Sequence, residues 1–301
     1  MMMTWCWAAD GSPGRPLMNL SPQLREKQQA LDALLRRFGR VVVAYSGGVD
    51  STLLAKVARD VLGRDNAPAV TADSASLARE DLSDAISLAR TLDLEHLVVR
   101  TAETEDPIYQ ANTAARCYVC KRALFQELEV IAAARGASAV LYGVLADDVI
   151  ADRPGHQAAL EHGVQAPLQQ AGLSKLEVRE LARALGLSNW DRPQNACLAS
   201  RIPHGSEVTP ERLRRVETAE AFLREQGFRQ VRVRDLGDRA RIEVEPEAVR
   251  RFWDPSLRLA TELALHAAGF RAVSLDRRGY RPGGADDAPA DEILLHAIAR
   301  C

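Results

Sequence analysis

The residues in this sequence with the clearest capacity for chemistry are cysteines. Of the five cysteines, Cys117 and Cys120 form a CxxC at the predicted start of a helix, and Cys197 lies in a proline-containing loop. A helix start and flanking basic residues favour the thiolate, which is the nucleophilic and metal-binding form. Cys6 and Cys301 lie near the chain ends, and we expect no role for them. The pattern indicates thiol or metal chemistry at the internal cysteines.

Several interpretations of the internal cysteines remain open at this point. Free cysteines are often small buried hydrophobic residues. A structural zinc site needs four ligands, and His204 could supply the fourth. A four-iron four-sulfur cluster on Cys117, Cys120 and Cys197 would leave one iron open for exogenous sulfur or substrate. Of the metal alternatives, only the cluster would explain why cysteines accompany the loop described next.

The second chemical feature is a glycine turn, Ser46-Gly47-Gly48-Val49-Asp50-Ser51, between the apolar run Val41–Ala44 and a helical pattern. The glycines allow a tight turn whose N–H groups suit a phosphate at the positive end of the helix. Asp50 is placed to hold Mg²⁺, although a plain turn with Asp50 or Ser51 as N-cap is the simpler alternative. Without a following Gly-Lys-Ser/Thr it is not a Walker A loop. It resembles the PP-loop of the ATP pyrophosphatase superfamily, which forms an adenylate and pyrophosphate from ATP.

Short apolar runs alternate with helical patterns over the first two thirds of the chain. The predicted strands cover residues 41–44, 69–72, 97–101 and 139–142. This alternation is typical of an α/β fold with a doubly wound parallel sheet, in which ligands bind at the carboxyl ends of the strands. The residues expected to line the nucleotide site lie in the glycine turn or near strand ends: Ala44, Ser46, Gly47, Gly48, Val49, Asp50, Ser51, Ala72, Ser74 and Gly143.

A further helix is predicted within residues 172–190. Ser174 and Glu177 have the spacing of a capping box at its start. Lys175 is then a first-turn cation, although cations are disfavoured at that end of a helix. Lys175 is either exposed or, as in some PP-loop enzymes with a similar Gly-Leu-Ser/Thr-Lys, close to the nucleotide phosphates.

After Gly205 the pattern changes to that of a small α+β domain. The predicted elements are a helix within 208–228, strands at 230–235 and 239–245, a helix at 255–268 and a strand near 272–275. The expected organisation is a disordered tail (1–20), the PP-loop domain (21–204), a substrate-binding or oligomerisation domain (205–282) and a C-terminal tail (283–301). The last ten residues of that tail have a weak helical pattern.

The predicted hairpin carries paired arginines. Strand alternation puts Arg232 and Arg234 on one face and Val231 and Val233 on the other. A solvated face of ion pairs is the common outcome for such residues. Two arginines two positions apart can also clamp one phosphate, because guanidinium groups bind phosphate bidentately.

Composition excludes several classes of protein. The 301 residues include 47% hydrophobic and 27% charged residues, with a net charge of −2. The charge gives no basic footprint of a dedicated nucleic-acid binder, and no apolar run approaches membrane-spanning length. The first residues lack the basic and apolar regions of a signal peptide. We therefore expect a cytoplasmic protein.

Together these motifs resemble one family. The chain contains, in order, SGGVDS, AVTADS, RCYVCK, GLSKLEVRELARALGL, WDRPQNACLASRIPHG, VRVRDLGDRARIEV and LDRRGYRPG. From about Ser21 to Gly283 it resembles the LarE family, ATP-dependent sulfur transferases that make the nickel-pincer nucleotide cofactor of lactate racemase. The resemblance implies adenylation of a carboxylate of pyridinium-3,5-dicarboxylate mononucleotide. Sulfur then displaces AMP to give a thiocarboxylate, and this occurs twice per substrate.

The resemblance also implies roles for residues. Family members with one cysteine in the ACLASR-like loop give up its sulfur, whereas those with an added CxxC resemble cluster-bearing enzymes, and this chain matches the second type. Arg232 and Arg234 match the pair that holds the substrate phosphate. The implied catalytic residues are Cys197, Asp50, Lys175 and Glu220. The implied cofactors are ATP, Mg²⁺ and a 4Fe-4S cluster on Cys117, Cys120 and Cys197. A homo-oligomer, either a hexamer or a trimer of dimers, is also implied.

One segment departs from the family pattern. Gly143-Val144-Leu145 and Ala151-Asp152-Arg153-Pro154-Gly155 stand where the family has Gly-Thr-Asn and Asp-Tyr-Arg-Pro-Gly. The departures put the polar contacts of this loop, and with them substrate choice, in question. Two other functions remain as alternatives: transfer RNA thiolation by a PP-loop enzyme, and a regulator that binds nucleotide without cleaving it.

Overall fold

The computed structural model describes residues 20–148, 154–193, 195–281 and 291–295. The chain forms two compact units that interleave along the sequence. The first comprises Met1–Ala72, Glu80–Val99 and Leu124–Gln194, and the second Asp73–Arg79, Arg100–Ala123 and Asn195–Cys301. The sequence suggested one boundary between residues 204 and 205. Instead, two earlier segments pack with the C-terminal part of the chain.

The first unit is built on a parallel sheet. Its strands are β1 (Val41–Ala44), β2 (Ala69–Asp73), β3 (His96–Arg100) and β4 (Ala139–Leu141), in the order β3-β2-β1-β4. Val43 of β1 lies opposite Ala69 on one side and Leu141 on the other, in parallel register. The valines of β1 are fully buried, as expected of a strand covered on both faces. The predicted α/β fold with a parallel sheet is confirmed.

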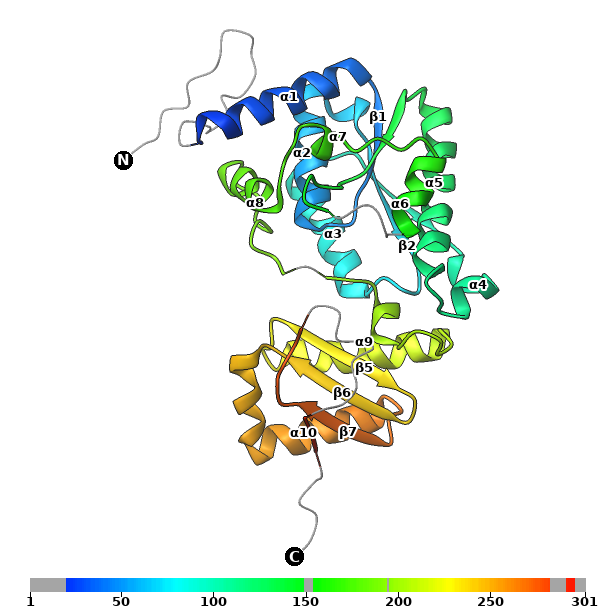
Figure 1. Cartoon of the computed structure of the whole chain (residues 1–301), viewed down its shortest axis with the longest axis vertical. Coiled ribbons are helices and arrows are strands. Elements are labelled where there is room, and N and C mark those ends of the chain that lie inside the picture. Colours follow the sequence, from blue (N-terminus) through cyan, green and yellow to red (C-terminus); the bar gives the residue numbers. More distant parts are fainter. Residues whose placement is uncertain (1–19, 149–153, 194, 282–290, 296–301) are drawn as a thin grey trace, which may run out of the picture. The chain divides into compact units, whose positions relative to one another are not determined.

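Helices cover this sheet (Figure 1). They are α1 (Pro22–Phe38), α2 (Val49–Leu62), α3 (Arg79–Thr91), α6 (Pro154–Glu161), α7 (Pro167–Gln170) and α8 (Lys175–Ala184), with the 3-10 turn η1 (Arg64–Asn66). Helix α5 (Arg116–Arg135) contributes residues to both units. Helix α2 packs against α1 and α8, burying Leu53 and Leu54 with Leu31 and Leu35 of α1. This packing fixes the direction of α2, whose first turn includes Val49, Asp50 and Ser51 of the glycine turn.

The second unit has its own sheet, β5 (Val231–Leu236), β6 (Arg239–Val244), β7 (Ala272–Asp276) and β8 (Glu292–Leu294), in the order β5-β6-β7-β8. Its helical elements are η2 (Glu103–Glu105), α4 (Pro107–Gln110), η3 (Leu198–Arg201), α9 (Pro210–Glu225), η4 (Pro246–Trp253) and α10 (Pro255–Ala267). Strands β5 and β6 form the predicted hairpin. Helix α9 packs on β5, and α10 packs on α9 and β7 (Figure 1).

The expectation of a helix in the last ten residues is wrong for residues 292–294. They form β8, antiparallel to β7, with Ile293 opposite Leu275. The edge of β7 would otherwise present unpaired backbone groups, and a short strand satisfies them. Within the described part of the chain, every helix is too short or too polar to cross a lipid bilayer.

Candidate functional site

The glycine turn lies where the order of the first sheet changes direction, between β1 and β4. Gly47 has φ +72°, and a Cβ there would lie 2.9 Å from the Cβ of Ala85. A Cβ on Gly143, directly after β4, would lie 3.1 Å from the backbone nitrogen of Ser51. Only glycine fits both positions without displacing backbone. The structure therefore brings Gly143 against the turn, and this end of the sheet is where doubly wound folds bind ligands.

Serine hydroxyls hold the shape of the turn. The Ser51 hydroxyl accepts a hydrogen bond from the Ser46 N–H at 3.2 Å and donates to the Gly48 carbonyl at 3.1 Å. The two hydroxyls of Ser46 and Ser51 are 3.1 Å apart. Helix α2 starts at Val49 with Gly48 as N-cap, and no side chain caps it. Its first N–H groups therefore have no capping side chain to compete with an anion.

Asp50 and Lys175 are direct partners. The Lys175 ammonium donates to both carboxylate oxygens of Asp50 at 2.7 Å. Burial raises the pKa of Asp50, and Lys175 partly offsets this. The predicted capping box of α8 is confirmed between Ser174 and Glu177, and the Asp147 carboxylate accepts from the Lys175 N–H at 3.0 and 3.2 Å. Capping and pairing together fix Lys175 beside the turn.

Asn189 is a functional candidate that the sequence analysis did not identify. Its side-chain amide donates to the Gly47 carbonyl at 2.9 Å and to the Thr52 hydroxyl at 3.0 Å. Asn189 is buried, and its Oδ1 has no hydrogen-bond partner among the described residues. It therefore braces Gly47 of the turn against Thr52, the residue directly after the turn. No local pattern marks it, because its partners are more than a hundred positions earlier.

Asn189→Ala should raise the KM for ATP about tenfold, because the Gly47 carbonyl loses its donor and the turn loses its fixed shape. Pyrophosphate release at varied ATP concentration measures this. Asn66→Ala is the matched control, since Asn66 donates to the Leu62 carbonyl at the far end of α2. An unchanged KM in Asn189→Ala, or an equal rise in the control, would contradict the bracing role.

In the second unit, Asn112 and Arg116 join the CxxC segment to the Cys197 loop. The Asn112 side chain donates to the carbonyls of Ile202, Pro203 and Ser206 at 3.2, 2.8 and 2.9 Å. The Arg116 guanidinium donates to the Asn112 side chain and, at 2.9 Å, to the Ala199 carbonyl. Asn112 is fully buried with φ +52°. These bonds place the start of α5 beside residues 199–206.

The three internal thiols consequently share one region of the second unit. Burial raises the pKa of the Cys120 thiol to about 12, and the charge on Cys197 and, to a lesser degree, Cys117 adds to the rise. Burial therefore opposes the Cys120 thiolate that the helix start was expected to favour. Cys117 is exposed, whereas Cys120 and Cys197 are partly buried against the core.

The described residues around the three internal cysteines are not arranged as a metal site. Within residues 20–148, 154–193, 195–281 and 291–295, no three His, Cys, Asp or Glu side chains are positioned to hold a metal ion. His204, the alternative fourth ligand, is exposed. The three cysteines therefore provide the thiolate ligands that an iron–sulfur cluster needs, but their side chains are not placed around a common centre in this structure.

The hairpin arginines are part of a buried charge network. Arg232 and Arg234 are 5% and 4% exposed, so the alternative of a solvated face of ion pairs is wrong, although the predicted alternation of faces holds. Arg234 donates to Glu243 at 2.8 and 3.0 Å. Burial and the nearby charge of Arg201 lower the pKa of Arg232 to about 10. The network contains Arg201, Arg224, Arg232, Arg234, Arg241, Glu220, Glu243 and Glu292.

Glu220 is the centre of one half of this network. It is completely buried and accepts from Arg201 at 2.7 and 2.9 Å, from Arg224 at 2.9 Å and from the Val233 N–H at 3.0 Å. Burial raises the pKa of Glu220, but the guanidinium groups outweigh it and the net pKa is lowered. Arginines outnumber glutamates in the network, which favours an anion nearby.

Comparison with known proteins decides the family. The chain is 39% identical to pyridinium-3,5-bisthiocarboxylic acid mononucleotide synthase of Lactiplantibacillus plantarum, over 88% of this chain and 95% of the relative. The chain belongs to this synthase family. It is also 46% identical to an uncharacterized Synechocystis protein, over 86% of this chain and 97% of that protein. Membership of the synthase family confirms the resemblance inferred from the motifs.

More distant similarities concern the ATP-handling part. The NAD synthase family model matches residues 27–146 of this synthase-family chain. A tRNA-specific 2-thiouridylase of Methylobacterium nodulans is 31% identical over 55% of this chain and 53% of its own length. These matches agree with a PP-loop fold that is shared by enzymes of different substrates.

The predicted synthase residues fall into the two units as follows. Ala44, the glycine turn, Ala72, Gly143 and Lys175 belong to the first unit, whereas Ser74, the three internal cysteines, Glu220, Arg232 and Arg234 belong to the second. Ser74 is buried, and its hydroxyl lies 2.8 Å from that of Ser76. The Ala151–Asp152 departure lies outside the described residues. Of the predicted nucleotide-site residues, Ser74 alone belongs to the second unit, which also holds the three internal cysteines.

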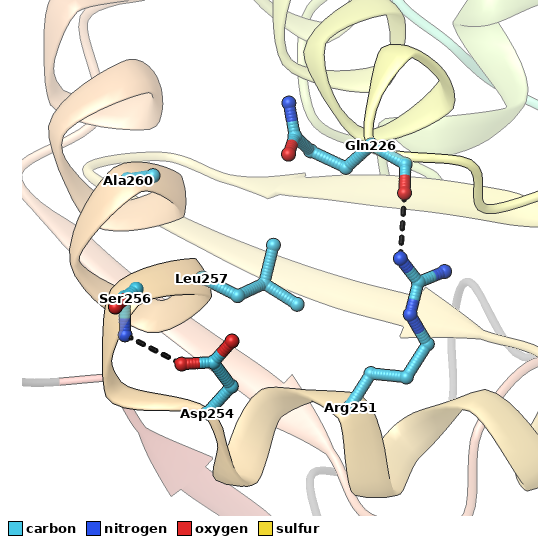
Figure 2. A pocket seen from close by; sticks show the side chains of 6 residues that line it. All are labelled: Gln226, Arg251, Asp254, Ser256, Leu257 and Ala260. Carbon is cyan, nitrogen blue, oxygen red and sulfur yellow. Dashed lines mark hydrogen bonds between the residues drawn. The ribbon is translucent and has the colours of Figure 1, made fainter.

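A surface cavity of about 560 Å³ lies at the start of α10 (Figure 2). Its lining residues are Gln226, Arg251, Asp254, Ser256, Leu257 and Ala260, none of which was predicted in a site. The Arg251 guanidinium donates to the carbonyls of Gln226 and Gly227, at 2.6 and 3.3 Å, and lies over the Phe228 ring. We assign no ligand to this cavity.

Proposed function

We propose that this chain is an enzyme that uses ATP to adenylate a carboxylate of pyridinium-3,5-dicarboxylate mononucleotide and replaces AMP with sulfur. The observation that carries the proposal is 39% identity to the pyridinium synthase over 95% of that relative. The glycine turn, with Gly47 and Gly143 packed too closely for side chains, supports it. Mass spectrometry of the pyridinium nucleotide after incubation with ATP, Mg²⁺ and a sulfur source tests it. The thiocarboxylate is expected, and the unchanged dicarboxylate would refute the proposal.

In the adenylation step, the turn would bind the β- and γ-phosphates through its N–H groups while the carboxylate attacks the α-phosphorus. The Lys175 ammonium would then leave the Asp50 carboxylate and donate to a phosphate oxygen instead. This exchange would free Asp50 to hold Mg²⁺. A single protein carboxylate is enough, because Mg²⁺ usually keeps several waters and binds substrate phosphates. Asp50 thus fits Mg²⁺ even though it is paired with Lys175 at 2.7 Å in the structure.

In the sulfur step, a sulfhydryl sulfur attacks the adenylated carbonyl carbon. A carbon–sulfur bond forms, the bond to the AMP oxygen breaks with its electron pair on AMP, and the sulfhydryl proton is released. We propose that Cys197 positions this sulfur, because its loop is held by hydrogen bonds from Asn112, Arg116 and Arg201. Glu220 is completely buried, which favours a positioning role for it.

We propose that Arg232 and Arg234 hold the substrate phosphate. Arg232→Ala should raise the KM for the mononucleotide by about 10–100-fold, because a charge-assisted hydrogen bond is lost. ATP affinity should remain within about twofold, since the ATP turn belongs to the other unit. Steady-state kinetics of pyrophosphate release measures both quantities.

Two controls sharpen this experiment. Arg251→Ala removes another guanidinium of the second unit, one that donates to backbone carbonyls. This change should leave the KM for the mononucleotide unchanged. With the pyridinium nucleoside, which lacks the phosphate, Arg232→Ala and the unaltered protein should behave alike. Equal loss of ATP and mononucleotide affinity would contradict the clamp.

The sulfur carrier that we propose is a four-iron four-sulfur cluster on Cys117, Cys120 and Cys197. Thiolates are the ligands of such clusters, and an open iron would supply a site for an additional sulfide. The described geometry holds no three-ligand metal group, so the proposal rests on donor chemistry and family resemblance. Anaerobic reconstitution should give about four irons per chain with a Mössbauer signal of this cluster. Stoichiometric zinc without iron uptake would remove the cluster.

Transfer RNA thiolation is the second candidate, supported by 31% identity to a thiouridylase over about half of each chain. The net charge of −2 argues against it. Retention on a transfer RNA column that falls steeply with salt would favour it. By resemblance, we also propose that the chain forms a homo-oligomer, which light scattering tests. We further propose a cytoplasmic location, because the first residues lack the pattern of a signal peptide.

A further inference from the structure

A buried polar cluster of the second unit has no role in the proposed reaction so far. It consists of Ser74, Ser76, Glu103 and Tyr109, which are between 1% and 7% exposed. The Ser76 hydroxyl lies 2.8 Å from that of Ser74 and donates to Glu103 Oε1 at 3.4 Å. Segments 73–79 and 100–110, which carry these residues, pack with the cysteine-bearing segments in this unit. The cluster is therefore built from the two segments that the sequence had assigned to the other domain.

Two atoms of this cluster are buried without a hydrogen bond. They are the Tyr109 hydroxyl and Glu103 Oε2. Ser76 lies close to Tyr109, yet no hydrogen bond of normal geometry forms between them. The Tyr109 hydroxyl can donate a hydrogen bond, and Glu103 Oε2 can accept one. Because unsatisfied buried polar groups destabilise a fold, these groups call for an explanation other than packing.

The buried polar cluster lies next to the segments that carry Cys120 and Cys197. The Leu198 N–H, directly after Cys197, donates to the Ser76 carbonyl at 2.8 Å. Tyr109 belongs to the same apolar core as Val119 and Leu198, and Cys120 and Cys197 pack against that core. Burial raises the pKa of Tyr109 above its ordinary value, and the charge at Cys197 is the next cause. Tyr109 and the two thiols are thus close neighbours.

We infer that Ser76, Glu103 and Tyr109 form a subsite for a terminal sulfhydryl sulfur next to Cys120 and Cys197. The Tyr109 hydroxyl donates to the sulfur, and the S–H donates to Glu103 Oε2, so one ligand satisfies both atoms. Ser76 positions Glu103 through its other oxygen. The ligand is free hydrosulfide, whose sulfur already has the oxidation state of the thiocarboxylate product, so the transfer needs no reductant. The inference rests on the proposed function and specifies which residues hold its sulfur.

Tyr109→Phe tests the subsite, because it removes the hydroxyl and keeps the ring. The KM for hydrosulfide in thiocarboxylate formation should rise about tenfold, while pyrophosphate release with the mononucleotide stays unchanged. The midpoint of urea unfolding should stay equal or rise, because a buried hydroxyl without a partner is removed. A merely structural hydroxyl predicts a lower midpoint instead. Thr261→Val, which removes another buried hydroxyl without a hydrogen bond to any described residue, in α10, is the control and should leave the KM for hydrosulfide unchanged.

A binding measurement separates the subsite from the reaction. Under anaerobic conditions, sodium hydrosulfide should raise the thermal unfolding midpoint of the unaltered protein, and less so that of Tyr109→Phe or Glu103→Gln. The same rise is expected in a Cys197→Ser background, because the ligand is free hydrosulfide and is not bonded to Cys197, and a rise lost there would contradict this ligand. An equal rise in Tyr109→Phe and the unaltered protein would overturn the subsite. Hydrosulfide binding without any thiocarboxylate product would instead refute the proposed function alone.

Discussion

Arg201→Ala should lower the free energy of unfolding by about 3–5 kcal/mol, because it leaves the carboxylate of Glu220 buried without its main partner. The side chains of Arg201 and Glu220 are 1% and 0% exposed. Arg201 donates to both oxygens of Glu220 and also to the carbonyls of Ala196 and Cys197, at 2.6 and 3.0 Å. Loss of these bonds should also free the Cys197 loop and lower thiocarboxylate formation.

Urea unfolding followed by far-ultraviolet circular dichroism measures the effect. Arg224→Ala is the matched control, because Arg224 binds the same carboxylate but its side chain is 18% exposed. A partly exposed pair of this kind should cost only about 1 kcal/mol. Glu220→Leu in the Arg201→Ala background should recover part of the loss, since the unpaired charge is then gone. A cost below that of Arg224→Ala would contradict the central position of Arg201.

Cys197→Ser should lower thiocarboxylate formation on the order of 10³-fold or more, as expected when a group that handles the transferred atom is removed. Serine keeps the size and geometry of the side chain, and the loop is held by backbone bonds such as the Ser200 N–H to the Cys197 carbonyl at 2.9 Å. Pyrophosphate release with ATP and mononucleotide should stay within about twofold. The two products are measured in one reaction by mass spectrometry and a coupled phosphate assay.

The same experiment distinguishes two roles of Cys197. If its own sulfur is given up, the protein loses the mass of hydrogen sulfide during turnover and stops after one round. If Cys197 positions exogenous sulfur, the mass of the protein is unchanged after turnover, which is the outcome we expect for a chain that has Cys117 and Cys120. Cys301→Ser, outside the proposed thiol set, serves as the control. Retained transfer in Cys197→Ser would exclude both roles.

Local sequence patterns were sufficient to predict the strands of the first sheet and several of the helices. The valines of β1, the capping box of Ser174 and Glu177, and the alternation in β5 each depend on residues a few positions apart. Such contacts follow from backbone geometry, with periods of 2 and 3.6 residues. The glycine turn is equally local, and its conformation at Gly47 agrees with the prediction.

Long-range packing decided what surrounds each chemical group. Periodicity separated the arginines of β5 from its valines, but it could not reveal that both faces are buried, since covering elements come from elsewhere in the chain. Helix position suggested a thiolate at Cys120, yet burial raises its pKa to about 12. Desolvation depends on neighbours that no local pattern specifies.

The sequence by itself determined the family, the parallel sheet and the types of residue available for ATP and sulfur chemistry. The tertiary structure alone decided that Asn189 braces Gly47 from 142 positions away and that Tyr109 belongs to the apolar core against which Cys120 and Cys197 pack. The physical reason is the same in both cases. A buried hydrogen bond or an orphaned polar atom is a property of the packed interior, where segments distant in sequence replace water as partners.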